Sequence, residues 1–326
     1  MGKTDTITKQ YMEDNQVFAD AFNYLIYGGR EVIQAERLHR LNSVAVEVPY
    51  GSDGAELPVQ KVRDELKYLT AKADEHAAYV VLGVENQDAV HYAMPVKNMV
   101  YDALEYAGQV RKAAASHRKA KDTKNHNTGE YLSGFYKEDR LIPVITLVIF
   151  FSAEEWDGPM SLHDMLCVQD EEILSLVENY RIHLIAPANL KDEELDKFHS
   201  SLKEVLSFIK YSTDRQQLEK LIAGNENFAA MDRKAAMVIN ACTNSKLKFD
   251  LSQEAAGMDM CKAIADIRNE SRNEGRNEGR AEGAFNKAKE TVLNLKAMGM
   301  EPEFIAKAVN EDVEIVKQWM DEGIQL

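Results

Sequence analysis

Apolar runs and one alternating segment predict the strands of this chain. Residues 77–84 (AAYVVLGV) and 141–151 (LIPVITLVIFF) are almost entirely apolar, which is typical of strands that are buried on both faces. The first run belongs to the stretch 63–87, which we interpret as two short strands joined by a tight turn. Residues 44–50 (VAVEVPY) alternate like a half-buried strand, and 181–185 (RIHLI) form a further short strand.

Apolar residues spaced by three and four positions predict the helices. In 14–27 (DNQVFADAFNYLIY), Phe18, Phe22 and Leu25 fall on one face, and the two glycines that follow end the helix. Residues 1–12 are polar and predict only a lead-in to this helix. Helices with similar spacing are predicted at 95–115, 192–210, 214–224 and 230–243.

The order of these elements predicts an α/β fold with a central mixed sheet flanked by helices. We assign residues 12–245 to this domain, a length that one core can organise. The composition then changes. We interpret 246–298 as a charged helical linker or oligomerisation arm, and 299–326 as a small pair of helices.

Within the arm, residues 269–283 (NESRNEGRNEGRAEG) repeat every four positions. Each glycine weakens a helix by about 1 kcal/mol relative to alanine. Arginines and glutamates recur at i,i+4, where like charges repel each other. A helix here is therefore marginal or held by a partner, and we expect a homo-oligomer formed through this C-terminal helical region.

The last segment, 301–320, contains two short helical patterns. It resembles a small helix-turn-helix, but its second helix carries acidic residues where a DNA-recognition helix needs positive charge. We therefore interpret it as a structural or self-association element, with DNA binding as the alternative. Its two helices are predicted to pack through Ile305, Val309, Val313, Val316 and Trp319.

Composition narrows the class of protein. With 326 residues, of which 45% are apolar, the chain can fill a sizeable core. The net charge of -15 argues against broad nonspecific binding to nucleic acid. The N-terminus is polar and the longest apolar run covers about half a bilayer, so we expect a soluble cytoplasmic protein that does not enter a membrane. Cys167, Cys242 and Cys261 have no metal-site spacing and are expected to be buried free thiols.

One stretch, 111–124, reverses the sign of the charge, with six cationic side chains and Asp122 as its one acid. If this stretch is a flexible loop, its cations would grip DNA phosphates without reading bases. An ordinary surface loop is the alternative. The candidate DNA-binding residues are Arg111, Lys112, Arg118, Lys119, Lys121 and Lys124.

The candidate active site lies in the predicted hairpin. Asp64 opens its first strand, and Glu85 with Gln87 closes the second. A carboxylate at the exit of a buried apolar run is costly unless a cation compensates it. Asp64 and Glu85 on adjacent strands could share Mg²⁺ or Mn²⁺, ions that prefer oxygen ligands and keep several waters. Gln87 could position a water or a phosphate oxygen, but it carries no positive charge.

Two further residues could support this site. Asp20 on the helix 14–27 could point into it, and a solvated position is the alternative. Lys97 could supply the charge that Gln87 lacks if the helix 95–115 folds back, and a surface lysine is the alternative. The sequence has no histidine pair spaced for zinc, no GxSxG and no P-loop, so zinc, serine-hydrolase and nucleotide-driven chemistry lack support.

The layout of Asp64 followed by Glu85-Asn86-Gln87 resembles the motif of the PD-(D/E)XK nuclease superfamily. Glutamine in the lysine position, after an apolar strand (VVLGVENQ), is similar to the Rpn family of recombination-promoting nucleases, also described as transposases. The FADAFNYLI helix, the VITLVIFF strand followed by SAEEWDG, and the Arg/Glu/Gly tail extend this likeness over about residues 12–240 and the tail.

The resemblance implies a PD-(D/E)XK-like core followed by a helical tail. It implies that Asp64 and Glu85 bind the metal and that Gln87 occupies the lysine position. The implied activity is a Mg²⁺-dependent endonuclease that hydrolyses phosphodiester bonds of DNA in recombination or transposition. The alternative is a catalytically weak or inactive protein of this fold that serves as a DNA-binding or assembly module. The missing lysine and the acidic net charge favour that alternative.

Overall fold

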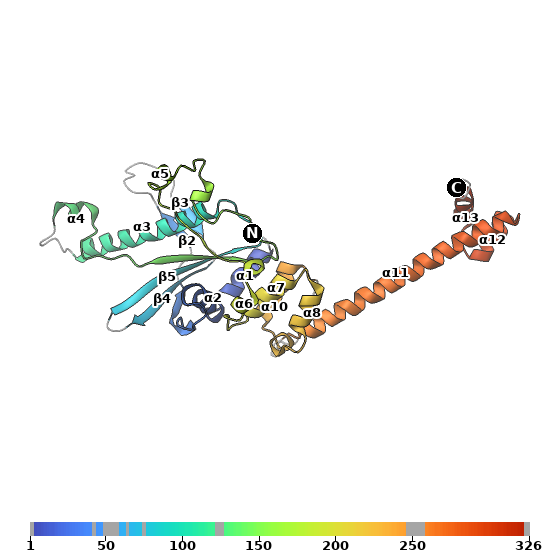
Figure 1. Ribbon diagram of the computed structural model, residues 1–326, viewed down its shortest axis with the longest axis horizontal. Coiled ribbons are helices and arrows are strands. Elements are labelled where there is room, and N and C mark those ends of the chain that lie inside the picture. Colours follow the sequence, from blue (N-terminus) through green and yellow to red (C-terminus); the bar gives the residue numbers. More distant parts are fainter. Residues whose placement is uncertain are drawn as a thin grey trace. The chain divides into compact units, whose positions relative to one another are not determined.

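The fold is known from a computed structural model, in which the chain forms two units, Met1–Cys261 and Lys262–Leu326 (Figure 1). Each unit has its own packed core and is described by itself. The structure describes residues 3–40, 44–47, 59–62, 65–73, 76–120, 127–245 and 258–322.

The first unit is built on a five-stranded mixed sheet with strand order β1-β4-β5-β6-β7. The strands β1, β4 and β5 pair antiparallel, while β5, β6 and β7 pair parallel. The prediction of an α/β fold with a mixed sheet is therefore confirmed, as is the hairpin of β4 and β5. The strands are β1 (Leu38–Arg40), β4 (Glu65–Ala73), β5 (His76–Gln87), β6 (Val144–Phe150) and β7 (His183–Ile185).

The helix α3 (Met94–Ala120) connects the parallel strands β5 and β6. It covers one face of β6, as the hydrogen bond from Thr146 Oγ1 on β6 to Asp102 on α3 shows, at 2.6 Å. The other face of β6 is covered too, and Leu147 and Ile149 are fully buried. Burial on both faces explains the continuous apolar run that predicted this strand.

The opposite face of the sheet is covered by α1 (Lys3–Met12), which contacts β5, and by α2 (Asn15–Tyr27), whose Phe18 ring contacts Lys67 of β4. The helix α10 (Arg233–Thr243) packs on α1, and α7 (Leu202–Tyr211) packs on α2 and α10. The helix α1 corrects the predicted polar lead-in. Tyr11 and Met12 are almost completely buried, and the Tyr11 hydroxyl lies 2.9 Å from Ser201 Oγ. The sequence gives little helical periodicity here because Ile7 is the one large apolar residue of α1 before its last turn.

Lys67, the third residue of β4, joins this helical layer to the sheet. Its side chain is 1% exposed, and its ammonium donates to the carbonyl oxygen of Glu13 and to Asn15 Oδ1, both at 2.8 Å, as well as to Met12 O at 3.3 Å. The two backbone carbonyls lie at the C-terminal end of α1, where cations are favoured. The ammonium also lies 4.5 Å from the centre of the Phe18 ring.

The predicted helix 192–210 is in fact two helices, α6 (Asp192–Leu195) and α7. The chain breaks between them because the carboxylate of Asp20 accepts the backbone N–H groups of His199 and Ser200 at 2.8–3.0 Å. Ser200 Oγ donates to the same carboxylate at 2.6 Å. The tertiary contact thus replaces the hydrogen bonds of a continuous helix.

The remaining elements of the first unit are short. The predicted strand 44–50 contains β2, which pairs with β3 in a separate two-stranded sheet. The helices predicted at 214–224 and 230–243 are present, and the side chains of Asp214 and Asp232 cap their N-termini. The short elements are η1 (Ala35–Arg37), β2 (Val44–Glu47), β3 (Val59–Val62), α4 (Thr128–Ser133), η2 (His163–Met165), α5 (Glu171–Leu174), η3 (Pro187–Asn189), α8 (Arg215–Ile222) and α9 (Glu226–Ala229).

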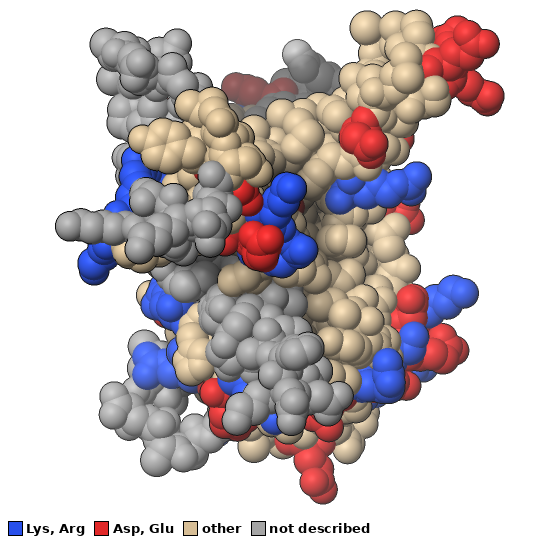
Figure 2. Space-filling model, turned by 90° about the vertical axis from the view of Figure 1, so that its left-hand side faces the viewer, with Lys and Arg blue, Asp and Glu red and all other residues tan. Residues whose placement is uncertain are grey.

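The basic stretch begins within a helix. Residues 111–120 form the last turns of α3, which corrects the prediction of a flexible loop there. The end of the first unit that carries α4 is shown face-on in Figure 2, where basic (blue) and acidic (red) side chains are interspersed. Positive charge on this face is therefore local.

The second unit consists of α11 (Met260–Ala297, which begins two residues before it), α12 (Pro302–Val309) and α13 (Val313–Glu322). The apolar residues predicted to join the last two helices do so, and Val292 of α11 completes their core. The Phe285 and Trp319 rings meet edge to face, with centroids 4.9 Å apart. Among the described residues of both units, no helix has the length and apolar character needed to cross a membrane.

Candidate functional site

An ion pair between Glu85 and Lys97 marks the carboxyl end of β5. Glu85 is 1% exposed, and its Oε2 lies 2.9 Å from Lys97 Nζ. The side chain of Lys97 is 27% exposed and lies 5.8 Å from the centre of the Tyr101 ring. The structure thus places Lys97 beside Glu85, as expected if the helix that carries it folds back over the strand end.

The local chain path explains why these two side chains meet. Glu85 is aligned with Val148 of the parallel strand β6, and side chains alternate between the faces of a strand, so Glu85 points to the face that α3 covers. After a tight connection, the Met94 N–H donates to His91 O and α3 begins. Lys97 stands in its first turn, directly above the strand end.

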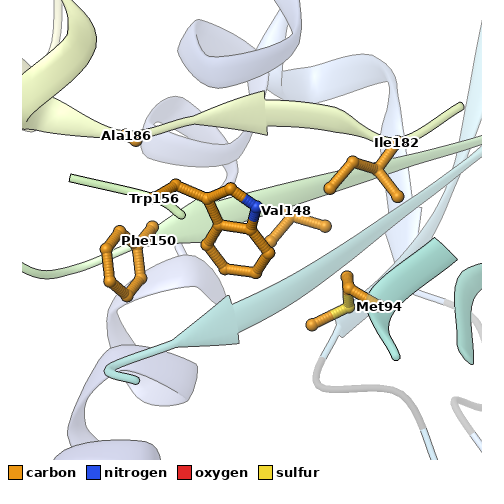
Figure 3. Close-up of a cluster of buried hydrophobic side chains, with 6 residues drawn as sticks. All are labelled: Met94, Val148, Phe150, Trp156, Ile182 and Ala186. Atoms are coloured by element: carbon orange, nitrogen blue, oxygen red, sulfur yellow. The ribbon is translucent and has the colours of Figure 1, made fainter. Parts of the chain in front are cut away.

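A cluster of apolar side chains lies next to this pair. Figure 3 shows the Trp156 indole ring beside Phe150 and Val148, with Met94 and Ile182 also in the cluster. The Phe150 and Trp156 rings meet edge to face, with centroids 5.3 Å apart. Such surroundings lower the local dielectric and strengthen the attraction between Glu85 and Lys97.

Two further polar side chains of α3, Asn98 and Asp102, are buried. Asp102 is buried and accepts hydrogen bonds from Thr146 Oγ1 and from the Tyr180 hydroxyl, both at 2.6 Å. Asn98 is completely buried, and in the described part of the chain its amide group has no hydrogen-bond partner. Burying an amide without a hydrogen-bond partner lowers the stability of a protein by about 1–3 kcal/mol. Asn98 is therefore a costly polar group, and it follows Lys97 in the sequence.

Gln87 ends β5. Its carbonyl oxygen accepts the Phe151 N–H at 2.7 Å, which extends the pairing of β5 with the chain after β6. Its side-chain Nε2 donates to Asn86 O at 2.7 Å. The half-buried amide is therefore turned toward its own backbone.

Asp64 lies outside the described residues. The residue after it, Glu65, pairs with Val84, the residue before Glu85. Asp20 is 5% exposed and is held by the hydrogen bonds from residues 199 and 200, so it occupies neither the site nor a solvated surface. Its helix α2 packs near Lys67, on the face of the sheet opposite Glu85.

The described candidates for DNA binding all lie on α3. Arg111, Lys112, Arg118 and Lys119 are exposed, whereas Lys121 and Lys124 lie outside the described residues. Arg111 and Arg118 are seven residues apart, as are Lys112 and Lys119, so the four cations share one side of the helix.

Sequence reasoning missed the buried polar residues of α3, Asn98 and Asp102, and the buried Lys67. Asn98 and Asp102 follow Met94 at intervals of four, so polar residues on an apolar stripe were a readable signal. Lys67 gave no comparable signal, because a lysine in a strand usually faces solvent. The expectation of buried cysteines is wrong for Cys167, which is exposed, whereas Cys242 and Cys261 are half-buried free thiols.

Comparisons with models of protein families, with curated proteins and with solved structures found no match. Among the described residues, no three His, Cys, Asp or Glu side chains gather as a metal site. The geometry around Glu85 is therefore the basis of any functional argument.

Proposed function

We propose that this protein is a metal-dependent DNA endonuclease whose active site is centred on Glu85. The observation that carries the proposal is the buried ion pair between Glu85 and Lys97 at the end of β5. Burying a carboxylate and an ammonium costs more than an apolar pair of similar volume would, so the pair is weak evidence for stability. A buried carboxylate paired with a partly exposed lysine at a strand end is more typical of a functional site.

We also propose that the mixed sheet is a PD-(D/E)XK-like core. The hairpin β4–β5 and the crossover helix α3 bring Glu85, Gln87 and Lys97 to one end of the sheet. Asp64 directly precedes Glu65 in the sequence, and Glu65 pairs with Val84, the residue before Glu85. That proximity supports a role for Asp64 as the second carboxylate.

The donor groups fit a magnesium ion. Glu85 offers a carboxylate in a buried setting that requires a cation, and carboxylate oxygens are ligands that Mg²⁺ prefers. We propose Asp64 and Glu85 as the residues that would hold Mg²⁺ or Mn²⁺. When bound, the ion supplies charge neutralisation and lowers the pKa of a coordinated water.

The other residues act on the DNA. The Lys97 ammonium brings to the site the positive charge that Gln87 lacks, and we propose that it contacts a phosphate oxygen. Gln87 could orient a water through its amide after leaving its own backbone. The cations of α3 would hold the DNA backbone without reading its sequence. A role in recombination or transposition follows from the sequence resemblance alone.

The test is cleavage of supercoiled plasmid with Mg²⁺ by the full chain. Glu85→Gln keeps the side-chain volume and should abolish cleavage, and Asp64→Asn should do the same. Asp88→Asn is the matched control, because Asp88 is an exposed carboxylate just beyond Gln87, and it should cleave at the wild-type rate. Wild-type cleavage by folded Glu85→Gln would refute the proposed site.

The rival is a non-catalytic DNA-binding or assembly module that uses the cations of α3 and the arm α11. The missing motif lysine favours it, whereas the cation that Lys97 brings to Glu85 favours the nuclease. Calorimetry with Mg²⁺ separates them, since the nuclease requires a site that Glu85→Gln loses. Sedimentation of the full chain tests the proposed homo-oligomer through the C-terminal helices.

A further inference from the structure

The short helix α4 presents two adjacent large apolar side chains to solvent. Tyr131 is 73% exposed and Leu132 is 78% exposed. Neither side chain contributes to a core, although together they are the apolar content of a six-residue helix (TGEYLS). Exposed apolar side chains that lie side by side are a candidate contact surface.

This exposure does not come from a loosely attached segment. Asn127 and Glu130 form a reciprocal capping box at the start of α4. Gly134 ends the helix with φ of 68°, and a Cβ there would lie 2.7 Å from the Cβ of Ala114 on α3. The end of α4 is therefore pressed against α3, at a position where only glycine fits.

The chain after α4 is also fixed to α3. The rings of His117 and Tyr136 stack with centroids 3.7 Å apart, and His117 Nε2 lies 2.9 Å from Asp139 Oδ2. Further along, the Ile142 N–H donates to Gln109 Oε1 at 2.7 Å. These contacts hold α4 beside the last turns of α3.

Those last turns carry positive charge. Lys112, Arg118 and Lys119 are exposed, and no acidic residue occurs between positions 106 and 120. An apolar pair bordered by exposed cations fits the chemistry of nucleic acid, in which phosphates surround stacked bases. A protein partner with an apolar patch would not need the cations.

We propose that Tyr131 and Leu132 contact the bases of a DNA duplex by stacking on them or wedging between them, while the cations of α3 hold its backbone. This inference rests on the proposed function and extends it to the substrate. Lys97 and Arg118 are separated by 21 residues of α3, which is about 31 Å along the helix axis. A duplex lying along α3 would therefore meet α4 about nine base pairs from the cleaved phosphate, at 3.4 Å per base pair.

The experiment measures base unstacking in the absence of metal. Full-length protein with EDTA is mixed with a series of duplexes of about 20 base pairs, long enough to span both contacts. Each duplex carries 2-aminopurine at a different position. Binding of the wild type should raise the fluorescence at one or a few positions, and Tyr131→Ser/Leu132→Ser should remove this rise and weaken binding about tenfold or more.

Leu176→Ser is the control, because Leu176 is an 88% exposed apolar side chain of the same unit away from α4, and it should behave as the wild type. Wild-type binding without a fluorescence change, or equal binding by the double variant, overturns this inference and leaves the proposed function standing. Absence of DNA binding by the wild type overturns both. A change in the sedimentation of the DNA-free double variant would instead assign the pair to a contact between protein copies.

Discussion

At the scale of single residues, Glu85 and Lys97 form a pair of unequal members. Glu85 is almost completely removed from water, whereas Lys97 keeps about a quarter of its side-chain surface exposed. Loss of the lysine therefore leaves a buried charge without this cation, whereas loss of both charges removes the problem.

Replacement of Lys97 alone should accordingly be more harmful than replacement of the pair. We expect Lys97→Met to lower the free energy of unfolding of the first unit by about 2 kcal/mol, and Glu85→Gln/Lys97→Met to recover most of this loss. Urea unfolding followed by Trp156 fluorescence measures both, with Trp319→Phe introduced so that Trp156 is the one remaining tryptophan. Lys112→Met, an exposed lysine of the same helix, should change stability by less than about 0.5 kcal/mol.

The additivity of the two changes is the critical result. If the double variant is as unstable as the sum of the single variants, Glu85 and Lys97 do not stabilise each other.

The sequence identifies candidate residues for the site, but it does not predict which of them contact one another. Glu85 was identified because an acid ends an apolar run, a signal contained in the sequence itself. The contact of Lys97 with Glu85 depends on the turn between β5 and α3, and helical spacing says nothing about that turn. Asp20 was misplaced for the same reason, because its hydrogen-bond partners lie about 180 residues away in the chain.

At the scale of elements, α3 and α11 differ in what supports them. The helix α3 packs on the sheet over much of its length, and the run Ala113–Ala114–Ala115 with its high helix propensity carries it through the basic stretch. Beyond residue 115 the sequence predicts a flexible loop because apolar periodicity stops, whereas the helix continues to Ala120. In α11, the described residues of the glycine-containing turns are exposed, and a Cβ at Gly275, Gly279 or Gly283 would meet no described atom within 4 Å.

An alanine in α11 should therefore stabilise it. A Cβ at Gly279 would meet no atom within 4 Å, so Gly279→Ala should strengthen the helix locally by about 1 kcal/mol. Hydrogen exchange of amides in residues 272–286 should slow about fivefold, the factor that corresponds to this free energy. The matched change Gly134→Ala should have the opposite effect around α4, because it combines positive φ with a clash against Ala114.

Faster exchange in Gly279→Ala would contradict an exposed helix. It would indicate that the glycine face of α11 is packed closely against another chain.

At the scale of the whole molecule, the two units have separate cores. The first surrounds the mixed sheet, and the second joins the end of α11 to α12 and α13. The change in composition along the sequence indicated a division, because the Arg/Glu/Gly repeat cannot supply a core. The order of the strands in the sheet was harder to predict from the sequence. The strand β1, which pairs with β4, has three residues and shows no clear alternation of apolar and polar positions.

Separate cores predict separate responses to mutation. Trp319 is 6% exposed, and Trp319→Ala should destabilise the second unit by about 3–5 kcal/mol through loss of the contacts with Phe285 and the cluster around Val292. The unfolding midpoint reported by Trp156 should stay unchanged. Circular dichroism and Trp156 fluorescence during one urea titration distinguish the two events, and a parallel shift of both signals would show that the units unfold together.

The buried ammonium of Lys67 has a consequence for how freely the sequence can vary. Its partners at positions 12 and 13 are main-chain carbonyl oxygens, which every amino acid provides. Substitution of Glu13 therefore leaves these acceptors in place, whereas substitution of Lys67 removes the donor from all of them at once. Evolutionary tolerance on the two sides of this contact should be unequal, with the strand residue fixed and the turn residue at position 13 open to exchange.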